Sequence, residues 1–215
     1  MITKKQKQKK KSSSFLVQGG ILAAAGILVR IIGMVYRIPM QNKIGNTAMG
    51  IYSSAYYIYN IMLILSSYSL PLAISKLIAA RRVHGKNQDV QRVFQAGLLF
   101  GLVAGGLMTT ILLFGADWIT VHIFNSPNSA LPLKVMAPTI LVFSVMGVVR
   151  GYFQGLGNMV PTSISQVIEQ VVNAIISVAA SFAFMHWFAN RETPAAYGAA
   201  GGTLGTLSGA LAAFV

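Results

Sequence analysis

Two arginines in the first long apolar stretch are the residues whose type and spacing first indicate chemistry. Arg30 and Arg37 lie seven positions apart, which is two turns of an α-helix, so we expect them to share one face. A charged group at membrane depth costs roughly 2.5–3.5 kcal/mol on insertion scales, and it is retained where it faces water or a partner. The spacing therefore predicts a cationic stripe that binds an anion such as a phosphate. Alternatively, Arg37 extends to the outer interface beside Pro39.

A polar stripe in a later apolar stretch is the second candidate site. Gln166, Glu169, Gln170 and Asn173 are spaced i, i+3, i+4 and i+7, which places them on one helix face. The opposite side consists of valine and isoleucine, so we expect the polar face to line the protein interior or a water-filled path. Glu169 is the only acidic residue well inside an apolar stretch. We expect it to pair with Arg30, to titrate in ion coupling, or to form a structural ion pair between helices.

Two further polar residues complete the predicted substrate-binding set. Asn60 lies deep in the second apolar stretch, and Arg150 begins the connection after the fourth. Near Asn60, the side chains of Tyr52, Tyr56 and Tyr59 share a stripe, which we interpret as an aromatic belt at the membrane interface.

The composition indicates an integral membrane protein. The chain has 215 residues, of which 54% are hydrophobic and 10% charged, whereas soluble domains carry about 25% charged residues. The net charge of +13 by itself is typical of nucleic-acid binding, but most of the chain is too apolar to form a basic surface in water. We therefore expect no nucleic-acid partner. The absence of cysteine excludes a disulfide scaffold and a cysteine metal site.

Six apolar stretches are near or above the ~20 residues that a helix needs to cross a bilayer. They cover residues 14–38, 49–80, 93–114, 133–156, 162–188 and 197–215. Backbone groups in lipid must bond within their own segment, so the predicted fold class is all-α, a polytopic membrane protein with six transmembrane helices. The last stretch has no polar flank, and we expect a lobe that is truncated at its C-terminus. In the third connection, residues 116–132, we expect residues 117–124 to form a helix extension or an interfacial piece.

The distribution of basic residues predicts the orientation. Residues 1–13 form a basic tail with six lysines, and five basic residues follow the second stretch. The alternate connections carry only Lys43, Lys134 and Arg191. Because cytoplasmic loops carry the excess of lysine and arginine, the N-terminus and the even-numbered connections are expected in the cytoplasm.

Glycines four positions apart predict close helix packing rather than chemistry. They form two rows: Gly97, Gly101 and Gly105, then Gly201, Gly205 and Gly209.

Motifs of enzymatic chemistry are missing from the sequence. It has no phosphate-binding glycine loop followed by lysine, no His-Glu-x-x-His and no aspartate-rich cluster. The four acidic residues offer little for paired-carboxylate catalysis. We expect no enzymatic activity, no cofactor and no metal site.

Several runs of residues resemble a family of polysaccharide-biosynthesis flippases. They begin with Arg-Ile-Ile-Gly-Met-Val-Tyr-Arg-Ile-Pro at residues 30–39 and Leu-Pro-Leu-Ala-Ile-Ser-Lys-Leu at 70–77. The most specific are Arg-Gly-Tyr-Phe-Gln-Gly at 150–155, Asn-Met-Val-Pro-Thr at 158–162 and Ser-Gln-Val-Ile-Glu-Gln at 165–170. Together they resemble the N-terminal portion of the stage V sporulation protein B branch of the multidrug/oligosaccharidyl-lipid/polysaccharide exporter superfamily, to which MurJ lipid II flippases are related.

The resemblance implies one lobe of a two-lobed transporter in the bacterial cytoplasmic membrane. It implies alternating access that moves an undecaprenyl-pyrophosphate-linked saccharide, lipid II or a polysaccharide precursor, for cell-wall, spore-cortex or polysaccharide biogenesis. Arg30 matches an arginine that lines a cationic cavity in lipid II flippases, and Arg37 sits one residue beyond their second arginine. The implied partners are the lipid-linked oligosaccharide, membrane lipids and the missing C-terminal lobe of the same protein.

Two other functions stay open at this point. An ion-coupled multidrug exporter of the same superfamily predicts a cavity rich in acidic residues, for which only Glu169 is available. A membrane assembly protein without transport fits the glycine-lined helices equally well.

Overall fold

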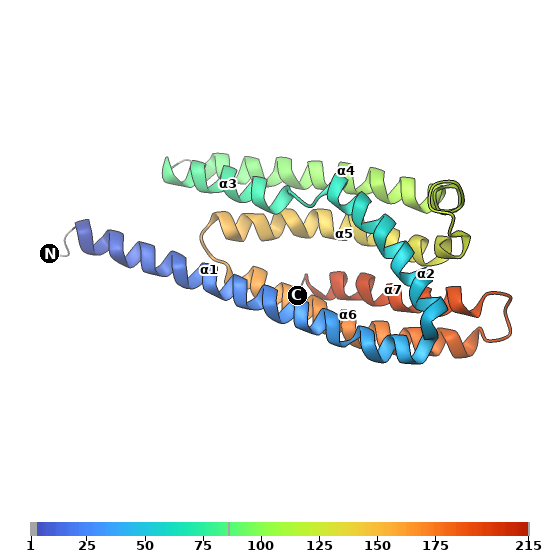
Figure 1. Cartoon of the computed structure of the whole chain (residues 1–215). Helices are drawn as coiled ribbons and strands as arrows, with labels where there is room; N and C mark the ends of the chain where they lie inside the picture. Colours follow the sequence, from blue (N-terminus) through green and yellow to red (C-terminus); the bar gives the residue numbers. More distant parts are fainter. Residues whose placement is uncertain (1–3, 86, 215) are drawn as a thin grey trace.

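The regular structure is helical throughout the part of the chain that the structure describes (Figure 1). The computed structural model describes residues 4–85 and 87–214, with side chains for 16–85 and 88–214. These residues form seven α-helices and a short 3-10 helix: α1 (Lys4–Val35), α2 (Arg37–Ser66), α3 (Leu70–Val83), α4 (Asn87–His122), η1 (Pro127–Ser129), α5 (Ala130–Gly155), α6 (Val160–Trp187) and α7 (Pro194–Ala212). The all-α prediction is confirmed. The side chains of the predicted basic tail lie outside the described residues.

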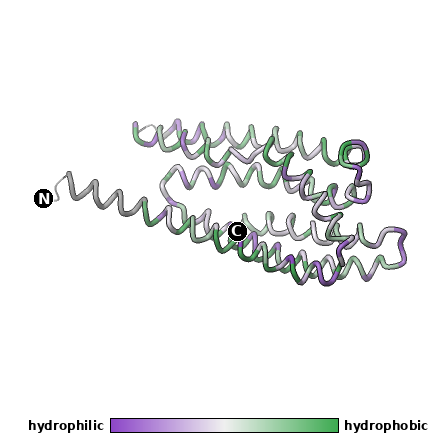
Figure 2. Tube along the Cα trace, viewed as in Figure 1, coloured by the Kyte–Doolittle hydropathy of each residue, from purple (hydrophilic) through white to green (hydrophobic). Residues whose placement is uncertain are grey.

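Four helical segments in the described residues are long and apolar enough to cross a membrane. They are Leu16–Val83, Gln88–His122, Pro127–Gly155 and Val160–Trp187. The first has 68 residues, several times the ~20 of one crossing, and it contains α1, α2 and α3. Figure 2 shows hydrophobic residues along the length of the helices, and on α4 Leu99, Phe100 and Val103 are exposed on the outside. The count of six crossings stays a prediction.

The second predicted stretch, 49–80, is not one helix. It is divided where α2 ends at Ser66 and α3 begins at Leu70. Pro71 lies in the first turn of α3. Because proline has no N–H to bond the carbonyl four residues earlier, it suits the first turn of a new helix better than the interior of a continuous one. Gly45 forms a kink inside α2, with φ 79° and ψ 171°, a region that favours glycine.

The first and third connections between the predicted apolar stretches are largely helical. Helical hydrogen bonds continue across Tyr36, whose N–H donates to Ile32 at 3.1 Å and whose carbonyl accepts from Met40 at 3.2 Å. Arg30 and Arg37 therefore lie on one nearly continuous helix. At the same end of the molecule (Figure 1), α4 runs on to His122, so residues 116–122 are a helix extension.

Rows of glycine set the spacing of three helix pairs, and both predicted rows are confirmed as packing surfaces. Gly101 of α4 faces α5, where an added Cβ would lie 3.1 Å from the Ser144 carbonyl oxygen. Gly209 of α7 faces α6, where an added Cβ would lie 2.5 Å from the Glu169 carbonyl oxygen. A third row, not anticipated, joins α5 to α3: Gly147, Gly151 and Gly155.

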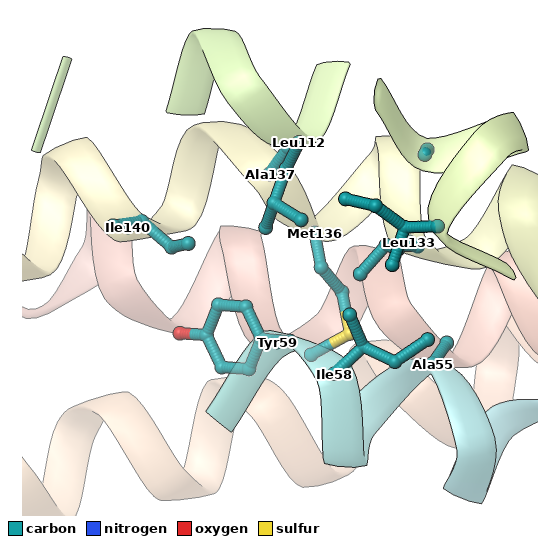
Figure 3. Close-up of a cluster of buried hydrophobic side chains, with 10 residues drawn as sticks. Ala55, Ile58, Tyr59, Leu112, Leu133, Met136, Ala137 and Ile140 are labelled. Atoms are coloured by element: carbon teal, nitrogen blue, oxygen red, sulfur yellow. The ribbon is translucent and has the colours of Figure 1, made fainter. Parts of the chain in front are cut away.

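A hydrophobic cluster fills the space between α2, α4 and α5 (Figure 3). Its fully buried side chains include Ile58, Leu112, Leu133, Met136 and Ile140. Tyr59 packs in the same cluster, so a polar hydroxyl is brought to its edge.

Helix α1 lies along α6 (Figure 1), but these two helices pack less closely than the glycine-lined pairs. An apolar cavity of about 360 Å³ remains between the two helices, lined by Ile21, Ala24, Ala25, Leu28, Ser163, Ile164, Val167 and Ile168.

We predict that Gly205→Ala destabilises the bundle by about 1–3 kcal/mol, because its methyl group would meet backbone atoms that cannot move aside. The added Cβ would lie 2.5 Å from the Ser177 nitrogen and 2.6 Å from the Asn173 carbonyl oxygen. Thermal melting of the purified protein in detergent measures the effect. The matched control is Gly106→Ala, since a Cβ at that helical position meets nothing within 4 Å. Equal melting temperatures for the two variants would contradict the prediction.

Candidate functional site

A largely buried ion pair between α5 and α6 is the centre of the candidate site. Arg150 Nη2 lies 2.7 Å from Glu169 Oε2, and the two side chains are 13% and 19% exposed. Arg150 also donates from Nε and Nη2 to Ser165 Oγ, at 3.2 Å and 2.8 Å. Ser165 Oγ in turn lies 2.8 Å from the Ala213 carbonyl oxygen. The ion pair is thereby tied to the end of α7.

The order of the elements explains why these two residues meet. Arg150 lies near the end of α5 and Glu169 in the first half of α6, and a short turn joins the helices. Gly157 in that turn has φ 78°, a left-handed conformation that glycine adopts without strain. Since α7 packs against both helices while α5 and α6 touch each other only sparsely, long side chains are needed to bridge them.

A pocket of about 320 Å³ adjoins the ion pair. Its walls come from α2, α3, α5, α6 and α7 and combine polar with aromatic side chains. The lining residues are Tyr56, Tyr59, Leu63, Ser67, Tyr68, Pro71, Phe143, Gly147, Arg150, Glu169, Gln170, Asn173 and Thr206.

Two hydroxyl groups of the pocket wall are buried without a hydrogen-bond partner among the described residues. They are Tyr59 Oη and Thr206 Oγ1, on side chains that belong to residues 1% and 6% exposed. A buried hydroxyl without a partner costs about 1–3 kcal/mol. Water or a ligand in the pocket would supply the missing bonds.

Four of the eight predicted site residues meet at this pocket. Arg150, Glu169, Gln170 and Asn173 line it together, so the polar stripe of α6 does face the protein interior. Gln166 and Asn60 are half-buried and lie outside the pocket lining.

The other two predicted residues lie on a different surface. Arg30 is exposed on α1, and Arg37 is exposed at the start of α2. Arg37 is nevertheless close to the pocket, because its guanidinium carbon lies 5.6 Å from the ring centre of Tyr56. Helix α1 also reaches the polar stripe at Gly33, where an added Cβ would lie 3.2 Å from Gln170 Nε2.

Two sequence-based interpretations are wrong. Glu169 does not pair with Arg30, because the turn after α5 brings Arg150 to it; the alternative of an ion pair between helices is the one that the structure shows. Tyr52 and Tyr59 do not form an interface belt, since both are about 1% exposed. Tyr52 instead shares a hydrogen bond of 3.2 Å with the hydroxyl of Tyr36.

Ser165, Tyr59 and Thr206 are the site residues that sequence reasoning missed. Ser165 lies four positions before Glu169, on the same helix face, and that spacing was an available signal. Thr206 follows a glycine of the predicted packing row, which marks a helix that approaches α6 closely. Tyr59 carried no signal that separates it from its neighbouring tyrosines.

Comparison with known proteins finds one family over almost the whole chain. The model of the polysaccharide biosynthesis protein family matches residues 16–215. Stage V sporulation protein B of Bacillus subtilis (strain 168) is 31% identical over 202 residues, 94% of this chain and 38% of that protein. Lipid II flippase MurJ of the same organism is 30% identical over 185 residues, 82% of this chain and 34% of that protein. No solved structure matches the chain.

The chain therefore spans little more than a third of the length of these relatives. A further relative, the uncharacterized membrane protein YabM of Bacillus subtilis (strain 168), is 30% identical over 91% of this chain and 35% of its own.

We predict that Arg150→Gln lowers the free energy of unfolding by about 3–5 kcal/mol, because it leaves the buried Glu169 carboxylate without a counter-charge. The double variant with Glu169→Gln should recover much of that loss. Chemical denaturation of the purified protein in detergent measures both. The control is Lys134→Gln, which breaks the more exposed 2.6 Å pair with Asp117 and should cost less than about 1 kcal/mol. A double variant no more stable than Arg150→Gln would argue against the ion pair.

Proposed function

The chain belongs to the polysaccharide biosynthesis protein family, and we propose that it forms the N-terminal lobe of a flippase that moves a lipid-linked saccharide across the bacterial cytoplasmic membrane. The proposed substrate is an undecaprenyl-pyrophosphate-linked saccharide, either lipid II or a polysaccharide precursor. The name of one relative, lipid II flippase MurJ, and the description of the family as polysaccharide biosynthesis proteins support this class of substrate.

The observation that carries the proposal is the pair of exposed arginines on the α1–α2 helix beside a polar pocket. Arg30 and Arg37 present positive charge on one helical arm, and Arg37 lies over Tyr56 of the pocket wall. A pyrophosphate requires fixed positive charge in a water-accessible cleft, and the guanidinium fork binds phosphate oxygens through two parallel bonds. The arginines supply that charge, while the pocket supplies amide and hydroxyl groups.

The size of the pocket indicates how the rest of the substrate is held. Drug-sized ligands occupy pockets of about 300–1,000 Å³, so a pocket of about 320 Å³ takes only part of a lipid-linked saccharide. The remaining surface would come from the C-terminal lobe, which we propose as the second wall of the cleft. Transport then proceeds by rocking of one lobe against the other, with no covalent bond made or broken.

The ion pair also weighs against the drug-exporter alternative. An exporter of cationic drugs needs acidic side chains free to pair with its substrate. Glu169 is the only acidic residue well inside an apolar stretch, and Arg150 neutralises it at 2.7 Å. The arginine row favours an anionic substrate instead.

We predict that Arg30→Ala abolishes the ability of the protein to restore growth in a flippase-depleted strain. Arg30→Lys should restore growth only in part, because an ammonium group lacks the planar fork. The measurement is growth at matched protein levels in the membrane. The control is Arg92→Ala, which removes one charge from a side chain 78% exposed on α4, far along the chain from the arginine row. Full growth with Arg30→Ala would count against the proposed function.

We also predict the orientation, with the N-terminus in the cytoplasm. The chain has no cysteine, so single cysteines report their side without background. A membrane-impermeant maleimide should label Asn128→Cys and Asn190→Cys in intact cells, and Gln88→Cys only after permeabilisation. All three positions are exposed. The reverse pattern would invert the proposed topology.

A further inference from the structure

The coordination of Arg150 leaves part of its guanidinium available. The fork carries five N–H groups. In the described part of the chain, hydrogen bonds to protein come from Nε and Nη2 only, and Glu169 is held through the single atom Oε2. The most stable arginine–carboxylate pairs use two parallel bonds, which this contact does not. Arg150 is thus neutralised by Glu169 without being saturated by it.

The pocket beside Arg150 holds further donors that lack an acceptor. Tyr59 Oη and Thr206 Oγ1 come from α2 and α7, whereas the ion pair comes from α5 and α6, and all four residues line the pocket. The amides of Gln170 and Asn173 line the same space. A group with several acceptor oxygens would satisfy these donors and the free part of the guanidinium together. A phosphate group has that chemistry, whereas the single carboxylate of Glu169 does not reach all of them.

We propose that Arg150, Tyr59 and Thr206 form an anion subsite for a phosphate or pyrophosphate group, and that Glu169 occupies it as an internal anion when no ligand is bound. Ligand entry displaces the Glu169 carboxyl group from Arg150 toward the Gln170 and Asn173 amides, where it takes up a proton or accepts hydrogen bonds from these amides in place of the ion pair. This inference rests on the proposed function, since it assigns part of the same pocket to the charged group of the substrate.

In the absence of ligand, the Glu169 carboxylate supplies the counter-charge that Arg150 needs inside a membrane. An uncompensated arginine in a buried position is strongly destabilising, and Glu169 removes that cost in the ligand-free protein. The same carboxylate competes with the ligand, so it lowers the affinity of the subsite. A transporter benefits from this arrangement, because a ligand that binds less tightly is released more readily on the other side.

The test is anion binding by the protein reconstituted in phosphatidylcholine nanodiscs, measured by isothermal titration. The two probes are inorganic pyrophosphate and farnesyl pyrophosphate, which separate a soluble from a lipid-borne source. Glu169→Gln should bind at least one probe about tenfold more tightly than the unaltered protein, which is about 1.4 kcal/mol. A gain with both probes identifies the phosphate group as the determinant, and a gain with farnesyl pyrophosphate alone assigns the subsite to a lipid-borne anion.

The control variant removes one carboxylate charge, as Glu169→Gln does. Asp117→Asn removes one carboxylate from a lysine pair at 2.6 Å outside the pocket, and its affinity for both probes should stay at the starting value. Adding Arg150→Gln to Glu169→Gln should abolish the gain. If Glu169→Gln does not fold, Glu169→Asp replaces it, because the shorter carboxylate reaches Arg150 less well and the same direction is expected.

Equal or weaker binding by the folded variant overturns the inference. This outcome is separate from failure of the proposed function. If the protein moves lipid-linked saccharides but Glu169→Gln shows no gain in affinity, only the proposed subsite is contradicted. If the variant shows the gain in affinity but the protein supports no transport, only the proposed function is contradicted.

Discussion

The bundle is organised by the requirement that a charge inside an apolar environment must find its partner within the protein. Arg150 and Glu169 meet that requirement across a gap between α5 and α6. The gap exists because α7 packs into the same region, where Gly205 and Gly209 allow backbone contact with α6. Ser165 ties the pair to the end of α7. Helix spacing, glycine placement and the polar pocket are thus parts of one arrangement around a single ion pair.

The sequence predicted the elements and the polar face of α6, because both follow from local periodicity. Gln170 and Asn173 share a face with Glu169 in any helix, and an apolar opposite side fixes which way that face points. The partner of Glu169 was beyond such reasoning, since it depends on the turn at Gly157 and on the bridging distance between two helices. Tyr59 and Tyr57 show a similar limit. Helix periodicity places them on different faces of α2, but which face is buried, Tyr59 at 1% exposure or Tyr57 at 72%, is decided by the neighbouring helices.

The arginines of the candidate site fall into two groups that differ in solvent exposure and in whether they have a counter-charge. Arg30 and Arg37 are exposed on a continuous helical arm, whereas Arg150 is enclosed with a counter-charge. An exposed guanidinium attracts anions over some distance, within the roughly 8 Å set by physiological salt. An enclosed one acts only on a group that has already entered. Under the proposed function, capture and close binding of an anion would fall to different helices.

The glycine rows have a mechanical consequence. The glycines of the packing rows on α4, α5 and α7 face the backbone or side chains of a neighbouring helix at short range, so these helices are held in close contact. On α1, Gly19, Gly20 and Gly26 meet nothing within 4 Å, and only Gly33 approaches a side chain of α6. The apolar cavity between α1 and α6 marks the same less close packing. The described chain thus combines tightly packed helices with one that packs less closely, and Arg30 is carried by the latter.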